Sequence, residues 1–350
     1  MHLYRWLCRK AHGSLFTRAG RKSGKENPMK FLIAGYGSIG RRHLRNLLAL
    51  GEHDILLYRT RHSTLPEEEI AGLPVETDLE AALAHRPDAV IISNPTALHM
   101  DVAIPAAEKG CAILLEKPIA HDLSRVPQLQ SAMERSGARV LVGFQFRFHP
   151  TLRRAASLLA EGAIGRVTSV RAHWGEYLPG WHPWEDYRQG YAARADLGGG
   201  VILTLCHPFD YLRWLLGEYS VDWAEGGSLG FGLEVEDSAE IGLRFARGAA
   251  GTLHLDYLQR PPTHTLEIIG TEGTLRWNNA DASLGFFRAD ASEWQVFHAP
   301  EGFERNWLFL DEMRHFLAVA RGEEEPVCTL EDGARALALA LSAREKIKRI

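Results

Sequence analysis

The chain has 350 residues, of which 45% are hydrophobic and 24% charged, the profile of an ordinary folded protein of about two domains. This excludes a wholly disordered chain or a small disulfide-stapled one, and the net charge of -4 gives no reason to expect nucleic acid or an acidic membrane as a partner. The four cysteines form no CxxC pair, and the longest uncharged stretch near the centre, Leu197–Phe209, is shorter than the ~20 residues of a membrane span. We therefore expect a cytoplasmic protein.

Residues 1–28 form a strongly basic segment. They contain seven lysine and arginine residues and one acid, Glu26, whereas the remaining chain has 33 bases and 43 acids. Arg5, Arg9 and Lys10 interrupt any apolar signal-peptide core. We expect a disordered extension, with the folded protein beginning at Met29, and keep a basic targeting segment as the alternative.

Strands and helices alternate from Lys30 to about Gly143. The expected strands are short and rich in Ile, Leu and Val, which is typical of buried parallel strands: residues 30–34, 54–58, 88–93, 111–115 and 138–143. Amphipathic helices are expected between them, over Ser38–Leu50, Asp78–His85, Leu98–Lys109 and Asp122–Ser136. This order predicts a doubly wound parallel sheet within an α/β protein.

After Pro150 the pattern changes to longer β-type runs. A helix over Thr151–Glu161 precedes strands expected at Val167–Tyr177, Ser238–Phe245, Ala250–Leu258, Thr265–Ile269, Gly273–Trp277, Leu284–Arg288 and Glu293–His298. Further helices are expected from Phe209 to Leu216, from Trp307 to Ala320 and from Glu331 to Arg349. We predict a first domain over residues 29–149 and a second over 150–350 with a large, mostly antiparallel open sheet, whose C-terminal helix packs back on the first domain.

A GxGxxG motif directly follows the first strand and begins the first helix. In dinucleotide-binding Rossmann folds the first glycine allows a tight turn, the second lets the backbone approach the pyrophosphate, and the third lets helix and strand pack closely. The free N–H groups of the helix then face the phosphates. The predicted cofactor residues here are Gly35, Tyr36, Gly37, Ser38, Ile39 and Gly40.

The end of the second strand predicts which nicotinamide cofactor binds. An acid at this position hydrogen-bonds the ribose of NAD, whereas an arginine can pair with the 2′-phosphate of NADP. Asp54 lies at the opposite end of the strand, and Arg59, Thr60 and Arg61 follow it. We expect NADP(H) rather than NAD(H), with solvated loop arginines as the alternative interpretation.

Further motifs mark the carboxyl ends of later strands and the second domain. Asn94-Pro95 with His99 follows the third strand, Glu116-Lys117-Pro118 ends the fourth, and a run of three glycines precedes His207. With Gly143–Pro150 and Ile268–Gly273, these motifs resemble the glucose–fructose oxidoreductase/inositol dehydrogenase family, Gfo/Idh/MocA. The resemblance covers the chain from about Met29 to its end, and Glu-Lys-Pro is its most specific motif.

The resemblance implies oxidation or reduction of a sugar, cyclitol or related hydroxyl compound. Lys117 matches the family's active-site lysine and His207 its catalytic histidine. The strand-end residues predicted to lie beside the cofactor are Ser93, Asn94, Pro95, Thr96, His99, Glu116 and Lys117. Many members carry an aspartate four residues before the histidine, where this chain has Leu203. The acid partner of His207 therefore stays open, with Asp210 and Asp186 as candidates.

The chemistry of the two residue types agrees with these assignments. A histidine near its working pH is a suitable base for the proton of an alcohol. A lysine at the edge of a parallel sheet can polarise a hydroxyl or carbonyl oxygen. The alternatives are a histidine that packs within its helix and a lysine that pairs with Glu116 on the surface.

An aromatic segment between residues 175 and 191 is the predicted substrate region. Aromatic faces with a few placed polar groups are typical of carbohydrate sites. The alternative interpretation is an aromatic cluster that packs the loop against the sheet. The predicted substrate contacts are Arg147, Tyr177, Trp181, Trp184, Asp186, Tyr187, Arg188 and Tyr191.

These observations favour an NAD(P)-dependent oxidoreductase that acts on a sugar, a nucleotide sugar or a related polyol. The alternatives are an NAD-dependent cyclitol dehydrogenase and a non-catalytic redox sensor. The sixteen histidines include no HExxH and no zinc-type spacing, so we predict no metal. An open sheet with one uncovered face predicts a homodimer or homotetramer.

Overall fold

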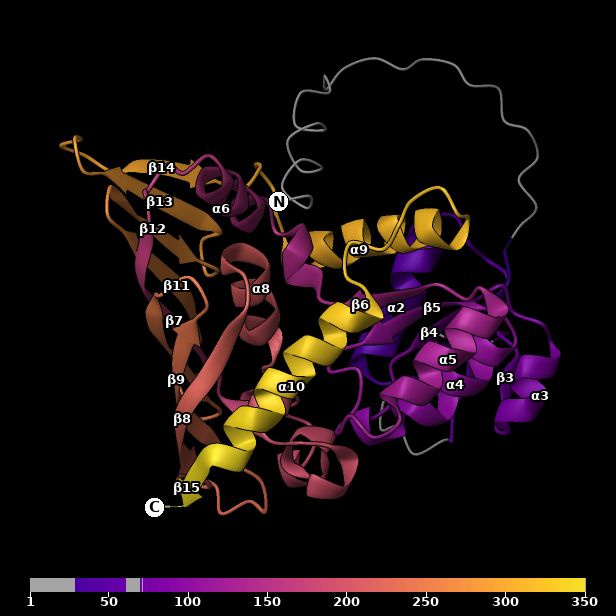
Figure 1. Cartoon of the computed structure of the whole chain (residues 1–350). Coiled ribbons are helices and arrows are strands. Elements are labelled where there is room, and N and C mark those ends of the chain that lie inside the picture. The colour runs from indigo at the N-terminus through magenta and orange to yellow at the C-terminus, as the bar shows by residue number, and fades with distance from the viewer. Residues whose placement is uncertain (1–28, 61–69, 71, 350) are drawn as a thin grey trace, which may run out of the picture.

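The computed structural model describes residues 29–60, 70 and 72–349. The predicted extension 1–28 and the predicted cofactor residue Arg61 lie outside these residues. The described chain forms two sheets with helices packed against them, and helices α9 (Arg305–Ala320) and α10 (Leu330–Lys346) run between the sheets (Figure 1). Within this part of the chain, no helix is long and apolar enough to cross a membrane.

The first sheet has six parallel strands in the order β3-β2-β1-β4-β5-β6. They are β1 (Phe31–Ala34), β2 (Ile55–Tyr58), β3 (Val75–Glu76), β4 (Ala89–Ile92), β5 (Ala112–Glu116) and β6 (Val140–Gly143). All residues of β1, β4, β5 and β6 are buried, as expected where helices cover both faces. The predicted doubly wound sheet is confirmed, and its order reverses between β1 and β4, where such sheets bind ligands.

The helices of this half follow the predicted order. They are α2 (Ser38–Ala49), α3 (Leu79–Ala84), the single turn η2 (Thr96–Leu98), α4 (His99–Glu108) and α5 (Val126–Ser136). Helix α5 begins four residues later than predicted because Asp122 forms a turn, in which its carboxylate accepts hydrogen bonds from the backbone and the hydroxyl of Ser124.

The second sheet has nine strands in the order β14-β13-β12-β11-β7-β10-β9-β8-β15. They are β7 (Val167–Gly175), β8 (Tyr219–Gly227), β9 (Ser238–Phe245), β10 (Ala250–Asp256), β11 (Thr263–Gly270), β12 (Gly273–Asn278), β13 (Ser283–Arg288), β14 (Gln295–His298) and β15 (Ile347–Arg349). The pairs β7–β10 and β8–β15 are parallel and the other pairs are antiparallel. This confirms the predicted mostly antiparallel sheet.

Two strands of this sheet were not predicted. Strand β8 has an irregular register between Val221 and Trp223, which breaks the alternation of buried and exposed residues that marks a half-buried strand. Strand β15 occupies residues expected to end a helix at Arg349. Helix α10 instead ends at Lys346, and the chain continues beside β8.

In the described chain, helices cover one face of the second sheet (Figure 1). They include α6 (Pro150–Ala160), α7 (Val201–Thr204) and α8 (His207–Leu216). The chain around them also forms short single-turn helices: η3 (Gln145–Phe148), η4 (Leu178–Gly180), η5 (Tyr187–Gln189), η6 (Tyr191–Ala193) and η7 (Ala195–Leu197). Along β7, Ala172 and Trp174 are buried on this inner face, whereas Arg171 and His173 point to the outer face. Helix α9 contacts α2 and β5 of the first half, whereas α10 contacts both β6 and β8 and so connects the two halves.

Candidate active site

The glycine turn between β1 and α2 has the geometry of a dinucleotide phosphate site. Gly35 has a φ of +97°, and a Cβ there would lie 2.6 Å from the backbone nitrogen of Asn94. A Cβ at Gly40 would collide with the carbonyl oxygen of Gly35, so the helix packs closely there. At Gly37 a Cβ would meet no atom of the described chain within 4 Å, apart from its own neighbours. The three glycines thus fit the turn, the packing and the open approach that a pyrophosphate requires.

Ser38 and Ile39 form the first turn of α2. The first N–H groups of a helix have no partner within it, and together with the helix dipole they favour an anion. Arg59 comes directly after β2, is only 5% exposed, and places its guanidinium 5.6 Å from the centre of the Tyr36 ring. Thr60 beside it is exposed. A cation therefore stands next to the glycine turn at the ribose end of the predicted cofactor site.

The loop after β4 lies against this turn. The hydroxyl of Ser93 donates a hydrogen bond to the carbonyl oxygen of Gly35 at 3.1 Å, and the Nε2 of His99 donates one to the carbonyl oxygen of Asn94 at 2.9 Å. Burial lowers the pKa of His99, so its ring is neutral. Ser93 and His99 thus hold the loop in shape, and Asn94 and Pro95 remain half-buried at the sheet edge.

Lys117 directly follows β5 and reaches the second half of the chain. Its Nζ donates a hydrogen bond to the carbonyl oxygen of Thr204 at 2.9 Å. Burial lowers the pKa of Lys117, but Tyr191, Cys206 and Glu116 together raise it above its ordinary value. Lys117 is therefore a cation at neutral pH, located where the two halves meet.

Glu116 is bound by a residue that the sequence analysis missed. Its Oε1 lies 2.8 Å from the Nε2 of His43, and its Oε2 accepts the backbone N–H of Lys117. Burial raises the pKa of Glu116, but His43 and Lys117 lower it overall, so it is a carboxylate. The available signal was a histidine on the apolar face of α2, one residue before the buried Leu44. By accepting the backbone N–H of Lys117, Glu116 helps to fix the position of the Lys117 backbone.

The two halves also approach each other at Gly198, the first of the three glycines before α7. A Cβ at Gly198 would lie 3.1 Å from the Cβ of Thr96 and 3.1 Å from that of His121. Its φ of +81° also disfavours a side chain. This glycine lets the second half lie close to the loop after β4.

His207 begins α8 and lies on the inner face of the second sheet. Its ring is 1% exposed and packs against Phe144, Phe146 and Trp174, with ring centres 5.5, 4.9 and 5.5 Å away. Burial, assisted by the charge of Lys117, lowers its pKa well below the ordinary value, so the ring is neutral. Its Nδ1 has no hydrogen-bond partner within the described chain, so no carboxylate of that part orients the imidazole.

Asp210 has a different partner from the one predicted. Both of its oxygens are bound by the guanidinium of Arg147, with Nε 2.9 Å from Oδ2 and Nη2 2.6 Å from Oδ1. Although burial lowers it, the neighbouring carboxylate raises the pKa of Arg147 overall. A neutral imidazole competes poorly with a guanidinium for a buried carboxylate. Asp210 therefore does not orient His207, and Arg147 lies in this buried pair rather than at a substrate surface.

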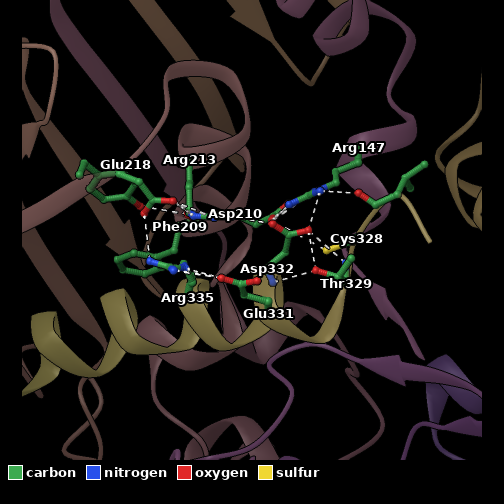
Figure 2. Close-up of polar contacts among 12 residues, drawn as sticks. Arg147, Phe209, Asp210, Arg213, Glu218, Cys328, Thr329, Glu331, Asp332 and Arg335 are labelled. Carbon is green, nitrogen blue, oxygen red and sulfur yellow. Dashed lines mark hydrogen bonds and ion pairs between the residues drawn. The ribbon is translucent and has the colours of Figure 1, made fainter. Parts of the chain in front are cut away.

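This ion pair belongs to a polar network between α8 and α10 (Figure 2). The Asp332 carboxylate on α10 lies between Arg147 and Arg213, accepting hydrogen bonds at 3.4 and 2.6 Å. Arg147 also donates to the carbonyl oxygen of Val327, just before α10. The network fixes α8, and with it His207 at the start of that helix, against η3 and α10.

Several predicted substrate residues pack within the second half. Tyr177 and Tyr187 contact the ring of Phe231, with centres 6.0 and 5.2 Å apart. Trp181 packs edge-on against the buried Tyr257 at 5.8 Å. These contacts agree with the packing interpretation of the aromatic segment.

The remaining residues of the segment differ in position. Trp184 is 66% exposed, and Arg188 lies on the surface 3.6 Å from Asp186. Tyr191 lies close enough to Lys117 for each charge to affect the pKa of the other. Tyr191 is 39% exposed as a whole, but loss of solvation raises the pKa of its phenol more than Lys117 lowers it, so the phenol keeps its proton. The structure thus brings Lys117, Tyr191 and His207 together from among the predicted residues.

The family follows from comparison with known proteins. Residues 29–144 match the oxidoreductase family with an NAD-binding Rossmann fold, and residues 152–276 match the GFO/IDH/MocA C-terminal domain. The chain belongs to the Gfo/Idh/MocA oxidoreductases. It is therefore an oxidoreductase whose first sheet is an NAD-binding Rossmann fold.

Similar proteins span most of the chain. A 1,5-anhydro-D-fructose reductase of Ensifer adhaerens is 29% identical over 73% of this chain and 76% of its own. A myo-inositol 2-dehydrogenase of Thermotoga maritima is 24% identical over 91% of this chain and 96% of its own. The WlbA dehydrogenase of Bordetella pertussis, solved with NADH and UDP-GlcNAcA, shares the fold with a TM-score of 0.75 at 24% identity, over 92% of this chain and 98% of its own.

Proposed function

We propose that the protein transfers a hydride between a nicotinamide cofactor and the hydroxyl- or keto-bearing carbon of a sugar, a nucleotide sugar or a related polyol. The observation that carries this proposal is the hydrogen bond from Lys117 to Thr204. It ties a cation at the edge of the cofactor sheet to the segment that leads into His207. The names of the relatives, which act on an anhydro sugar and on inositol, support this substrate class.

The two residues divide the work on the substrate oxygen. A nicotinamide dinucleotide on the glycine turn supplies the hydride acceptor or donor. The neutral ring of His207 accepts the hydroxyl proton, and Lys117 stabilises the negative charge that develops on the oxygen as this proton leaves. An ammonium group has three donors, so Lys117 can keep its bond to Thr204 while it binds substrate.

The test begins with a turnover screen. The purified protein is incubated with NAD or NADP and a panel of free sugars, anhydro sugars, inositols and nucleotide sugars, and absorbance at 340 nm is followed. Lys117→Ala should lower turnover by roughly a hundredfold or more, with the cofactor dissociation constant within twofold of the wild type. Cofactor binding without turnover of any compound would favour the redox sensor, and turnover of inositols alone would favour the cyclitol dehydrogenase.

For the cofactor, NADP(H) is favoured over NAD(H). Arg59 occupies the position that reads the ribose, beside Tyr36 of the glycine turn, and no acid stands at the end of β2. Arg59→Ala should weaken NADP binding at least tenfold, because a charge-assisted contact to the 2′-phosphate is lost, and change NAD binding less than twofold. Tighter binding of NAD than of NADP by the wild type would contradict this choice.

We also propose that the protein is a homodimer or homotetramer that works in the cytoplasm. The outer face of the second sheet exposes Trp223, Trp294 and Val296, and no helix of the described chain covers it. Such a face favours contact with a second copy. The described cysteines, Cys111, Cys206 and Cys328, are all buried as free thiols, which suits a reducing compartment.

A further inference from the structure

Three adjacent strands place a compact set of metal-type ligands on the outer face of the second sheet. His173 on β7 and His254 on β10 are register partners on neighbouring parallel strands, and Glu240 on β9 is the register partner of His254 on its other side. Asp256 lies two residues further along β10 and so points to the same face. One ring nitrogen of each histidine and one Asp256 oxygen all lie within 4.8 Å of one another.

The orientation of His254 is that of a metal ligand with a supporting carboxylate. Its Nδ1 lies 2.7 Å from the Oε2 of Glu240, while its Nε2 points to the Oδ2 of Asp256 at 3.1 Å. Metal-binding histidines commonly donate one ring N–H to such a carboxylate, which fixes the tautomer and the ring direction. Two ligands of a tetrahedral zinc ion lie roughly 3.4 Å apart, given bonds of about 2.1 Å. The separation of Nε2 and Oδ2 is already close to this value.

The other members of the set are also held in place. The Oδ1 of Asp256 accepts the backbone N–H groups of Leu258 and Gln259, both at 2.6 Å, which leaves Oδ2 as the oxygen that faces the histidines. The amide nitrogen of Gln259 donates to Thr263, so its oxygen is turned toward the Nε2 of His173, 2.5 Å away. Two imidazoles, a carboxylate and an amide oxygen therefore converge.

A glycine provides the room for this arrangement. Gly175 is the register partner of Asp256, and a Cβ there would lie 2.2 Å from the Oδ2 of Asp256 and 2.5 Å from the Oε1 of Gln259. Any other residue at position 175 would displace the two oxygens that face the histidines. Asp256 itself is 5% exposed, whereas the side chain of His254 is 31% exposed, so an ion can enter from the outer face.

We propose that His173, His254 and Asp256 bind a zinc-type transition-metal dication on the outer face of the second sheet, with Glu240 as the carboxylate that orients His254. Imidazole with oxygen ligands suits Zn²⁺ and its neighbours rather than Ca²⁺ or Mg²⁺, which prefer all-oxygen sites. The ion cross-links β7 and β10 through their side chains. Trp174, the neighbour of His173, points to the inner face and contacts His207, so the metal lies on the opposite side of the sheet from the hydride-transfer site. His173 is separated from His254 and Asp256 by some 80 residues of sequence, so the three ligands form no local zinc-binding motif.

The experiment measures metal binding by the full-length protein after treatment with EDTA and removal of the chelator. Titration calorimetry with ZnSO₄ should show one site per chain, and Co²⁺ should give the visible absorption of a site with few ligands. His254→Ala and Asp256→Asn should each weaken Zn²⁺ binding at least a hundredfold, and Glu240→Gln by about ten- to a hundredfold. The Asn variant keeps the oxygen that accepts the two backbone N–H groups, so it preserves the turn after β10.

A matched control is His298→Ala. His298 is an exposed histidine on β14, opposite Ser283 in the same sheet and outside the set of ligands. This variant should bind Zn²⁺ as the wild type does. His173→Gln serves as a second ligand variant if His254→Ala fails to fold, which circular dichroism reports. Absence of a stoichiometric site in the wild type, or equal binding by the His298 and ligand variants, would overturn the proposal and leave His254 as an ion-paired histidine only.

Discussion

The two faces of the nine-stranded sheet use the same residue types under opposite physical conditions. On the inner face, burial lowers the pKa of His207 and His264 well below the ordinary value and that of His149 to about 4. On the outer face, hydrogen bonds that the ring donates to Asp256 and Glu240 raise the pKa of His254 to about 9. The first group is neutral at pH 7, whereas His254 is charged unless a bound metal ion displaces its proton. The difference shows that enclosure without a carboxylate, rather than the residue type, keeps the ring of His207 neutral.

The ion pairs of the two regions differ in the same way. Arg147 and Asp210, beneath the inner face, have side chains only 6% and 2% exposed. On the outer face, Arg276 pairs with Glu267 at 2.6 Å, but its side chain is 62% exposed. Removing one partner of a buried pair leaves an uncompensated charge, whereas an exposed charge is taken up by water. Removing one partner of the buried pair should therefore destabilise the protein far more than removing one partner of the exposed pair.

The largest expected effect tests this contrast directly. Arg147→Met should lower the free energy of unfolding by about 3–5 kcal/mol, because Asp210 is left buried without its cation. Arg276→Met, which breaks the exposed pair on the outer face, should cost less than about 1 kcal/mol. Urea unfolding of both variants beside the wild type measures the two costs. Equal losses would mean that burial does not distinguish the two faces in the way described.

The loss of stability at acid pH should come in part from His149 on the inner face. His149 has a pKa of about 4 in the folded protein and about 6.5 when unfolded, so the unfolded chain takes up the proton first as the pH falls. The contribution of the neutral His149 ring to the free energy of unfolding is fully present above pH 6.5. It is lost as the pH falls to 4, and the total loss is about 3 kcal/mol. Urea unfolding at pH 7, 6, 5 and 4.5 should show a steeper loss for the wild type than for His149→Asn. Parallel profiles would show that His149 does not titrate as described.

Replacing a histidine should also affect turnover differently on the two faces. His207→Gln should lower turnover by roughly a hundredfold or more, since the amide cannot accept the proton, and leave the cofactor dissociation constant within twofold. His298→Gln changes a histidine on the outer face in the same way and should leave turnover within twofold. Steady-state kinetics with the best compound of the turnover screen provide the comparison. If the His207 variant keeps most of its activity, Tyr191 becomes the better proton donor, because it lies beside Lys117.

A feature of the site could be predicted from the sequence when residues close together in the chain define it. The glycine turn was predicted because a few consecutive residues define its geometry, and the Glu116-Lys117 motif was found through the family resemblance, which also rests on consecutive residues. Asp210 was one candidate partner of His207, beside Asp186, because residues three apart can lie on one face of a helix. Its actual partner, Arg147, is 63 residues away, and nothing in the sequence indicates which buried cation a carboxylate will meet.

The same limit applies to the residues that were missed. His43 reaches Glu116 from a helix 73 residues earlier in the chain, and its only local sign is a polar residue on an apolar helix face. The outer-face set on β7 and β10 depends on strand register, which the sequence does not state. By contrast, the doubly wound sheet was predictable because apolar strands alternate with amphipathic helices over more than a hundred residues.

A smaller expected change in stability tests what covers the outer face. Trp294 is 38% exposed there and packs against Phe287 and Arg276, so Trp294→Asp should lower the free energy of unfolding of a single chain by about 1–2 kcal/mol. If two copies meet at this face, the buried charge will also weaken their association and shift the mass seen by light scattering at micromolar concentration toward the monomer. Trp307→Asp is the matched control, because Trp307 is 40% exposed but lies on α9, which packs against α2 and β5 instead. The same mass for both variants would place the subunit contact elsewhere, and a monomeric wild type would remove the proposed assembly altogether.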